Sequence, residues 1–438
     1  MTAKPDYPGL KETQKWFNAL IDKSSFEVKP VKLADSTDWL VIDGAIRHSS
    51  GLFFNIVGAI WDEDSNRSYS QPFIEQREVG SLGFLLFKEG NIRQLLVQAK
   101  IEPGNVGVIQ LAPTYQATAS NAARIHGGKE PLYPAIFYPQ SKHLVFETLQ
   151  SEQGGRFLGK QNRNILSVAD SRFEAAITHR WFQADEFLEL LAQNNLVNTD
   201  ARSVLVCSPW EELVSRQPFT RYKTPFAKDL QKSYRSKSAA KLKKIEAKMN
   251  SLRGEIHPIR IVDIDRMDGW QLTDYGLKPQ NNQPFAVRQI QVIAKIREVP
   301  SWDQPIIDSK NCGYVDLVCG RQKATLRFLF CMRREPGLHD YVEFSPTFIQ
   351  EPGVANIPSK DLALKTKGEI LAESLQSDEG GRFFQDINRY RIIDAGEVYK
   401  VDEGWHWLTL AEIKELISKG SYFTNESRSV LSLLLWWL

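Results

Sequence analysis

The sequence lacks any apolar run long enough to cross a bilayer and any excess of charge of one sign. Its most apolar stretch, residues 430–438, is far shorter than the roughly 20 residues of a membrane helix, and we expect it to dock on a core as a terminal helix or strand. Lys and Arg number 55 against 53 Asp and Glu, a net charge of +2. That balance argues against capture of nucleic acid or anionic membrane as the main task. With no apolar signal region near Met1, we expect a cytoplasmic protein.

Cysteine is scarce, and the familiar catalytic motifs are missing. The four cysteines form no Cys-x-x-Cys pair, which predicts free thiols in a reducing compartment. The chain has no Gly-x-Gly-x-x-Gly after a strand, no Walker sequence, no His-Glu-x-x-His and no nucleophile elbow. It also lacks a dense carboxylate box suited to Mg²⁺. Redox cofactor chemistry and metal-dependent hydrolysis therefore have no support, and we expect no cofactor and no metal.

What the sequence does contain is a long internal repeat. A chain of 438 residues is too long for one ordinary core, which predicts two or three domains. Segments of the first half recur in the same order in the second half, which predicts a tandem duplication of a domain of roughly 200 residues. The matching segments are Gln71–Ile74 with Gln304–Ile307, Lys100–Gly104 with Arg333–Gly337, Ser151–Phe157 with Ser377–Phe383, and Asn198–Leu205 with Thr424–Leu431.

Each half is strand-rich, closes with a helix and lacks βαβ alternation, which predicts the α+β class. Helical spacing marks residues 8–26, 184–191 and 238–252, whereas residues 46–51 are predicted to form a turn or loop. A Lys- and Arg-rich segment interrupts the repeat; we interpret it as a solvated linker helix, with a binding role for its positive face as the alternative. The predicted domains are 1–215 with an N-terminal helix, the basic linker helix 216–255, and 256–438.

The repeated segments combine turns with chemically active side chains. Glu102-Pro103-Gly104 makes a tight turn by itself, but Lys100, Gln110 and Thr114 accompany it. The Gly-Gly-Arg strings that begin at Gly154 and Gly380 offer bare backbone N–H groups and a guanidinium. These groups suit a diphosphate, and the same string also fits a hairpin turn with a surface Arg. We leave these alternatives open.

The two copies are not equal. His48 and His126 have no matching His in the second copy, and Arg333 replaces Lys100. A lone loop His is more often a surface residue than a catalyst, but the loss of both indicates that the first copy kept chemistry which the second lost. Trp39 and Trp270 are core aromatics by default, with stacking on a base or sugar as the alternative.

These residues resemble a known family. The strings His48–Phe54, Val97–Asn105, Gln110–Gln116 and Thr118–Asn121, with His126-Gly127-Gly128, are similar to those of the NDP-hexose 2,3-dehydratases, lyases that make deoxysugars for glycosylated natural products. The resemblance runs nearly end to end. It implies two Nudix-like domains per subunit with mixed sheets flanked by helices, a homodimer, and a pocket for a dTDP-linked 4-keto-6-deoxyhexose in each half. The implied reaction removes water across carbons 2 and 3, giving a 3,4-diketo-2,6-dideoxy sugar.

Under that resemblance, a base, an enolate-stabilising donor and an acid are needed. Our hypothesis gives charge stabilisation to Lys100 or His126 and proton transfer to Glu102 or His126. The catalytic candidates are Lys100, Glu102, Gln110, Thr114, Tyr115 and His126. The predicted substrate contacts are Trp39, His48, Thr118, Ala119, Ser120, Asn121, Ser151, Gly154 and Arg163 in the first copy, and Trp270, Arg333, Thr347, Ser377, Gly380, Arg382, Asn388, Arg389 and Tyr390 in the second.

Two other functions remain open from the sequence. A non-catalytic nucleotide-sugar binding protein with degenerate pockets would bind dTDP tightly without turnover. A Nudix pyrophosphohydrolase would release a nucleoside monophosphate in a Mg²⁺-dependent reaction, and the missing carboxylate box argues against it.

Overall fold

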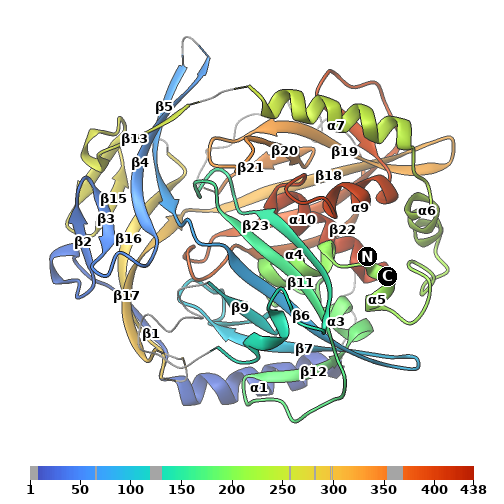
Figure 1. The fold of residues 1–438 in the computed structure, drawn as a ribbon, viewed down its shortest axis with the longest axis horizontal. Coiled ribbons are helices and arrows are strands. Elements are labelled where there is room, and N and C mark those ends of the chain that lie inside the picture. Colours follow the sequence, from blue (N-terminus) through green and yellow to red (C-terminus); the bar gives the residue numbers. More distant parts are fainter. Residues whose placement is uncertain are drawn as a thin grey trace.

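The computed structural model describes residues 8–64, 67–118, 131–255, 258–280, 283–295, 297, 299–352 and 368–438. The predicted site residues Ala119, Ser120, Asn121 and His126 lie outside these ranges. The described chain forms four β-sheets, two of them mixed, with helices packed between and around them (Figure 1), which confirms the predicted α+β class. Below, residues up to 215 are called the first half and residues from 256 the second half.

The main sheet of the first half has seven strands. Its central path is β10 (Leu144–Ser151), β11 (Gln161–Ala169), β6 (Gly80–Glu89), β7 (Ile92–Ile101) and β12 (His179–Gln183), with β8 (Ile109–Ala112) beside β7 and β9 (Tyr115–Ala117) beside β6. β11 and β6 run parallel, and the other pairs are antiparallel. Gly90 makes the turn between β6 and β7 at a φ of 53°, which glycine adopts readily.

The second half repeats this arrangement strand for strand. Its sheet contains β22 (Glu369–Ser377), β23 (Ile387–Glu397), β18 (Cys312–Gln322), β19 (Thr325–Arg334) and β24 (Trp405–Leu408), with β20 (Val342–Ser345) beside β19 and β21 (Phe348–Gln350) beside β18. Again only the central pair, β18 with β23, runs parallel. Segments that match in sequence therefore occupy matching places in the two sheets.

The two smaller sheets exchange strands between the halves. One contains β2 (Trp39–Ile42), β3 (Ala45–His48), β4 (Asn55–Asp64) and β5 (Arg67–Glu75), and it is completed by β13 (Ile259–Val262) of the second half. The other contains β14 (Trp270–Thr273), β15 (Gly276–Pro279), β16 (Phe285–Ile293) and β17 (Ser301–Ser309), completed by β1 (Glu27–Pro30) of the first. Separating the halves would therefore unpair strands in both sheets.

One local prediction is only partly right. Residues 46–51 were expected to form a turn or loop; residues 49–51 do form a turn, but β3 extends to His48 and pairs with β2 throughout. The physical reason is that Ala45 and Ile46 are buried in the core of the small sheet. Their packing holds the segment in an extended conformation, although its last residues are polar.

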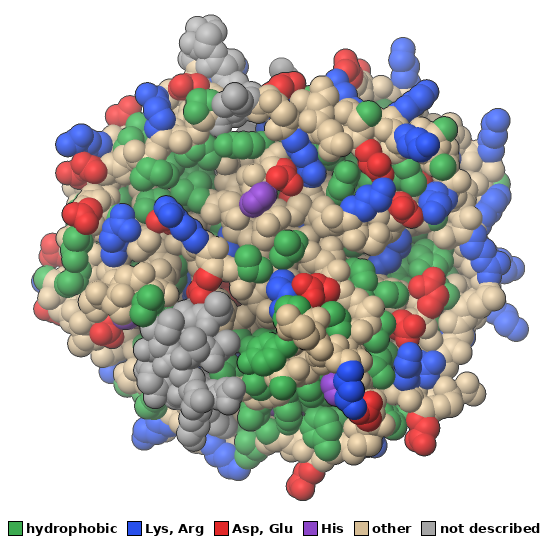
Figure 2. Space-filling view, viewed as in Figure 1, with side chains coloured by type: hydrophobic (Ala, Val, Ile, Leu, Met, Phe, Trp, Pro, Cys, Tyr) green, Lys and Arg blue, Asp and Glu red, His purple; other side chains and the backbone are tan. Residues whose placement is uncertain are grey.

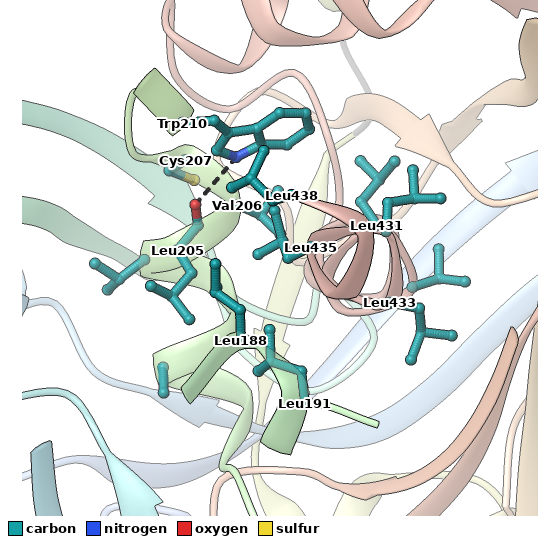
Figure 3. Packing of buried hydrophobic residues seen from close by; sticks show 14 of the residues in the cluster. Leu188, Leu191, Leu205, Val206, Cys207, Trp210, Leu431, Leu433, Leu435 and Leu438 are labelled. Atoms are coloured by element: carbon teal, nitrogen blue, oxygen red, sulfur yellow. Dashed lines mark hydrogen bonds between the residues drawn. The ribbon is translucent and has the colours of Figure 1, made fainter. Parts of the chain in front are cut away.

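Two helices lie side by side at the centre of the molecule (Figure 1): α4 (Thr199–Cys207) and α10 (Asn425–Leu431). Thr199 Oγ1 donates to Asn425 Oδ1 at 3.1 Å, and Arg428 Nε donates to Ser203 Oγ at 2.8 Å. Around them one hydrophobic cluster draws on both halves and includes Leu205 and Leu435 (Figure 3). The apolar C-terminal stretch docks here, as predicted, in a 3-10 helix over Ser432–Trp437.

The remaining helices cover the outside. They are α1 (Pro8–Ser24), α3 (Ala184–Leu190), α5 (Trp210–Leu213), α6 (Pro225–Tyr234), α7 (Ala239–Arg253) and α9 (Leu410–Ile417), with short 3-10 helices at Leu33–Asp35, Pro134–Phe137 and Ile264–Arg266. The basic segment thus forms two helices. Leu242, Ile245 and Met249 of α7 are buried, and basic side chains gather on the outer edge near α6 and α7 (Figure 2). Within the described ranges, no helix has both the length and the apolar character needed to span a membrane.

Candidate active site

A cavity of about 450 Å³ lies between the two halves, and both contribute to its wall. The first half supplies polar and aromatic groups that include Trp39, His48, Lys100, Glu102 and Thr118. The second half supplies Arg297, Asp303, Glu379, Gly381 and Arg382. The volume falls in the range of small-molecule sites. A pocket in each half was predicted; this cavity instead needs residues from both.

A buried lysine and a buried glutamate lie together at the end of β7. Lys100 Nζ lies 3.6 Å from Glu102 Oε1 and donates to the carbonyl oxygen of Gln116 at 3.2 Å. The two side chains are only 8% and 7% exposed. The pKa of Glu102 is raised because burial disfavours the carboxylate; Lys100 opposes the rise, and the charge of Glu379 adds to it. The pair therefore brings a cation and a readily protonated carboxyl to one wall of the cavity.

The turn that carries Glu102 docks on the other half. In what we call the Glu-Pro-Gly turns, Glu102–Gly104 and Glu335–Gly337, each glycine donates its N–H to a glycine carbonyl of the opposite half. Gly104 donates to Gly380 at 2.8 Å, and Gly337 donates to Gly154 at 2.8 Å. A Cβ on Gly104 would stand 1.6 Å from the carbonyl oxygen of Phe383. Only glycine permits this approach, so the two turns fix the position of one half against the other.

Further carboxyl groups, those of Glu152 and Asp200, also line the cavity. Glu152 Oε1 accepts from Asn162 Nδ2 at 2.6 Å, and Glu152 Oε2 accepts from Asn425 Nδ2 at 3.1 Å. Burial, and then the charge of Glu379, raises the pKa of Glu152 to about 7 and raises that of Asp200, at the start of α4, well above its usual value. Burial also lowers the pKa of the neighbouring Lys160. Such a cluster can hold protons at neutral pH, which suits general acid–base chemistry.

Aromatic rings and a guanidinium form another wall. Trp39 Nε1 donates to the carbonyl oxygen of Asp303 at 2.8 Å, and its ring lies edge-on to His48 at 5.4 Å. The N–H of Ser50 donates to His48 Nδ1 at 3.1 Å, which assigns the proton of the neutral ring to Nε2. Burial lowers the pKa of His48, which favours that neutral form. The guanidinium of Arg382 lies 4.2 Å from the ring centroid of Phe54. Flat rings beside a fork of N–H donors suit a nucleobase and a phosphate.

Three predicted catalytic side chains are held by the protein itself. Thr114 Oγ1 accepts from the N–H of Leu85 at 2.9 Å and donates to the carbonyl of Leu96, although the residue lines the cavity. Tyr115 also lines the cavity and stacks on Phe137, with ring centroids 5.3 Å apart. Gln110 lies outside the lining, with its Nε2 donating to the carbonyl of Asn195 at 2.9 Å and to Ser377 Oγ at 2.7 Å.

Most other predicted contacts lie away from this cavity. Of the first-copy residues, Ser151 donates to Ser421 Oγ at 3.2 Å, Gly154 packs against the second Glu-Pro-Gly turn, and Arg163 pairs with Glu147 at 2.7 Å. Among the described residues of the second copy that were predicted as contacts, Arg382 lines the cavity. The others, which do not, are Trp270, Arg333, Thr347, Ser377, Gly380, Asn388, Arg389 and Tyr390.

Sequence reasoning missed several groups at the site. Glu379 stands directly before one Gly-Gly string and Glu152 stands two residues before the other, and Glu379 matches Gln153 in the first copy. That difference between the copies could have indicated Glu379. Lys160 and Asp200 carry no comparable indication, and Arg297 and Asp303 of the second half reach the cavity only because the halves pack together.

Similarity to known proteins extends over nearly the whole chain. A sequence model of the family described as NDP-hexose 2,3-dehydratase matches residues 10–208 and 253–434. A relative from Saccharopolyspora spinosa, named dTDP-4-dehydro-6-deoxy-alpha-D-glucopyranose 2,3-dehydratase, is 32% identical over 96% of this chain and 90% of its own length. Relatives with the same name from Amycolatopsis orientalis and Streptomyces violaceoruber are 29% and 31% identical, over 96% and 95% of this chain and 89% and 95% of their own lengths.

Proposed function

The chain belongs to the NDP-hexose 2,3-dehydratase family, and we propose that it removes water across carbons 2 and 3 of dTDP-4-keto-6-deoxyglucose in the cavity between its two halves. It is therefore an enzyme of deoxysugar biosynthesis. We place the active site in this cavity because the buried side chains of Lys100 and Glu102 face it and both halves form its wall. The comparisons give no support to the non-catalytic alternative.

The proposed chemistry follows from the ketone at carbon 4. That ketone acidifies the proton on carbon 3, and removal of the proton leaves an enolate whose oxygen needs a positive partner. Lys100 is proposed to supply it. The enolate then expels the hydroxyl on carbon 2, which takes a proton from a carboxyl and leaves as water. Glu102 is proposed as this acid, because burial raises its pKa. The resulting enol takes up a proton at carbon 2, loses its hydroxyl proton at carbon 3, and gives the 3,4-diketo-2,6-dideoxy sugar.

The nucleotide end is proposed to lie against the aromatic wall. Trp39 and His48 offer ring faces and edges, and Arg297 and Arg382 offer positive charge for the diphosphate. Ser120, Asn121 and His126 remain proposals from the family resemblance. Of the two copies, we propose that the first is catalytic, because Lys100 lines the cavity.

The wider assembly is also a proposal. We infer two Nudix-like domains, 1–215 and 256–438, joined by the basic segment 216–255, with mixed sheets in the same strand order as support. We further infer a homodimer, a cytoplasmic location and a role in glycosylating a natural product, each from the family. Sedimentation velocity of the full chain would test the dimer, and a single species at the monomer mass would overturn it.

The function is tested by direct assay. Purified protein is incubated with dTDP-4-keto-6-deoxyglucose, and the products are followed by mass spectrometry. The expected product has lost one water. Unchanged substrate in the presence of folded protein would overturn the proposal, and tight dTDP binding without turnover would favour the non-catalytic alternative. A third arm with Mg²⁺ and dTDP-glucose checks for release of dTMP.

A further inference from the structure

We propose that Glu379, a residue of the second half, is the base that removes the proton from carbon 3, facing the Lys100–Glu102 pair of the first half across Gly381. This assignment rests on the proposed dehydration and adds a catalytic residue to it. Its carboxylate lines the cavity, and within the described chain it makes no hydrogen bond or ion pair. It is therefore available to a substrate.

The geometry brings two carboxyl groups together at one glycine. A Cβ placed on Gly381 would stand 3.2 Å from Glu379 Oε1 and 3.4 Å from Glu102 Oε1. Gly381 also lines the cavity, so the space that a side chain would fill is open to a ligand. In the gluco configuration the hydrogen on carbon 3 and the hydroxyl on carbon 2 lie on the same face of the ring, so a base and an acid on one side of the sugar suit their removal.

The backbone holds this arrangement in place. The N–H groups of Arg382 and Phe383 donate to the carbonyl oxygen of Glu379 at 3.0 Å and 2.9 Å. The bond from Gly104 to Gly380 ties the same turn to the one that carries Glu102. Because each carboxyl is at most two residues from that bond, neither needs a domain movement to reach the other. The site is pre-organised by the docking of one half on the other.

The surroundings separate the roles of the two carboxyl groups. Glu102 is buried beside Lys100, and burial together with the negative charge of Glu379 favours its protonated form. We therefore assign the proton donor to Glu102 and the proton acceptor to Glu379, whose side chain also lines the cavity. In the step, the bond between carbon 3 and hydrogen breaks, the proton goes to Glu379, and the electron pair forms the enolate. The enolate then expels hydroxide from carbon 2, which takes the proton of Glu102 and leaves as water.

The other copy lacks this base. Gln153 occupies the place of Glu379 beside the second Glu-Pro-Gly turn, and an amide cannot accept the proton at neutral pH. There, too, the guanidinium of Arg156 is paired with Glu351 at 2.7 Å. The two copies therefore differ in the residue that the opposite half contributes, Glu379 or Gln153, as well as in the exchange of Lys100 for Arg333.

The test separates proton removal from loss of water. Wild type, Glu379→Gln, Glu379→Asp and Glu102→Gln are incubated in D₂O with dTDP-4-keto-2,6-dideoxyglucose, which has no hydroxyl at carbon 2 to lose. Exchange of the carbon 3 proton is followed by NMR, and dehydration of the natural substrate is followed by mass. Glu369→Gln, an exposed carboxylate at the far end of β22, is the matched control. Binding of dTDP and the unfolding midpoint report whether each variant is folded.

We expect Glu379→Gln to lose about 100-fold or more in both exchange and dehydration, the scale of a general base. Glu379→Asp keeps a carboxylate and should exceed the Gln variant at least about tenfold. Glu102→Gln should keep exchange but lose dehydration. If Glu379→Gln, or Glu379→Ala should the former not fold, exchanges as fast as wild type, the assignment is wrong although wild type dehydrates. If wild type binds dTDP but neither exchanges nor dehydrates, the proposed function itself fails.

Discussion

Arg156 Nη2 lies 2.7 Å from Glu351 Oε2, and this ion pair joins the two halves in the second copy. The guanidinium also lies 4.1 Å from the ring centroid of Phe285. At the matching place in the first copy, Arg382 lies over Phe54 at 4.2 Å, and Thr118 stands where Glu351 would be. Both Thr118 and Arg382 line the cavity. One guanidinium is thus neutralised inside the protein, and the other faces the cavity.

Glu351→Gln should destabilise the fold. Burial pushes the pKa of Glu351 up, but Arg156 outweighs it and the net pKa is lowered. The stabilisation is therefore present above the unfolded carboxyl pKa and is lost as pH falls through the folded one. With the Glu351 side chain 38% exposed, solvent screening limits the loss at pH 7 to about 1 kcal/mol. Urea unfolding at pH 7 and pH 4 measures it. Glu369→Gln is the control, and an equal loss in both would contradict the assignment.

Gly104→Ala and Gly337→Ala should disrupt the docking of the halves. The added Cβ would stand 1.6 Å from the carbonyl oxygen of Phe383 in one case and 1.9 Å from that of Phe157 in the other. Backbone cannot move aside as a flexible side chain can, so we expect a loss of about 3 kcal/mol or more in unfolding free energy. Gly9→Ala, where a Cβ meets nothing within 4 Å, is the control. Melting curves that coincide with wild type would show that the turns do not hold the halves together.

The strand order within each half could be predicted in outline, because each buried strand has its own run of apolar residues in the sequence. The partners of the short strands could not. β1 and β13 are four residues each, and no pattern within Glu27–Pro30 or Ile259–Val262 indicates that each pairs with the opposite half. The cavity between the halves could not be predicted for the same reason, because it depends on this exchange of strands between them. Lys100 and Glu102 could be identified because they adjoin a repeated turn, whereas Arg297 approaches the site only through packing between the halves.

Lys100→Met tests which copy is catalytic. Removal of the ammonium that is proposed to stabilise the enolate should lower kcat by about 100-fold or more, the scale measured for the loss of one oxyanion donor. Binding of dTDP should change little, because the ammonium lies at the reacting end. Arg333, which lies outside the cavity lining, should give a loss below about tenfold when changed to Met. Steady-state kinetics and dTDP titration measure both. Equal losses in kcat would contradict a single catalytic copy.

Gly381→Ala tests the space between the two carboxyl groups. The added Cβ would meet Glu379 Oε1 at 3.2 Å, so Glu379 must shift by a few tenths of an ångström, and it would touch Glu102 Oε1 at 3.4 Å, the near limit of ordinary contact. We expect kcat to fall about tenfold with little change in stability, because small displacements of reacting groups are costly. Gly155→Ala is the matched change in the other copy, where the nearest atom, Glu351 Oε1, is at 3.6 Å. It should keep full activity, and equal effects of the two changes would contradict the prediction.

Lys414 should make stability depend on pH. Its Nζ donates to the carbonyl oxygens of Val206 at 2.7 Å, Cys207 at 3.1 Å and Ser208 at 2.7 Å, and it lies 4.6 Å from the ring centroid of Trp210. Val206, Cys207 and Trp210 belong to the hydrophobic cluster that Figure 3 shows. Burial lowers the pKa of Lys414 to about 7 from its ordinary 10.5. The cost of burying the cation is therefore present below about pH 7 and disappears as pH rises toward 10.5.

The sign follows from proton binding. Between these two pKa values the unfolded chain binds more protons at Lys414 than the folded chain does, so the unfolding free energy rises with pH. Lys414→Met removes this contribution and leaves the other titrating groups in place. The difference in unfolding free energy, wild type minus variant, should therefore rise by about 1 kcal/mol or more between pH 7 and pH 9. Urea titrations at both pH values measure this difference, and Lys243→Met on helix α7 is the control. A difference that stays constant or falls would show that Lys414 is buried without a change in pKa.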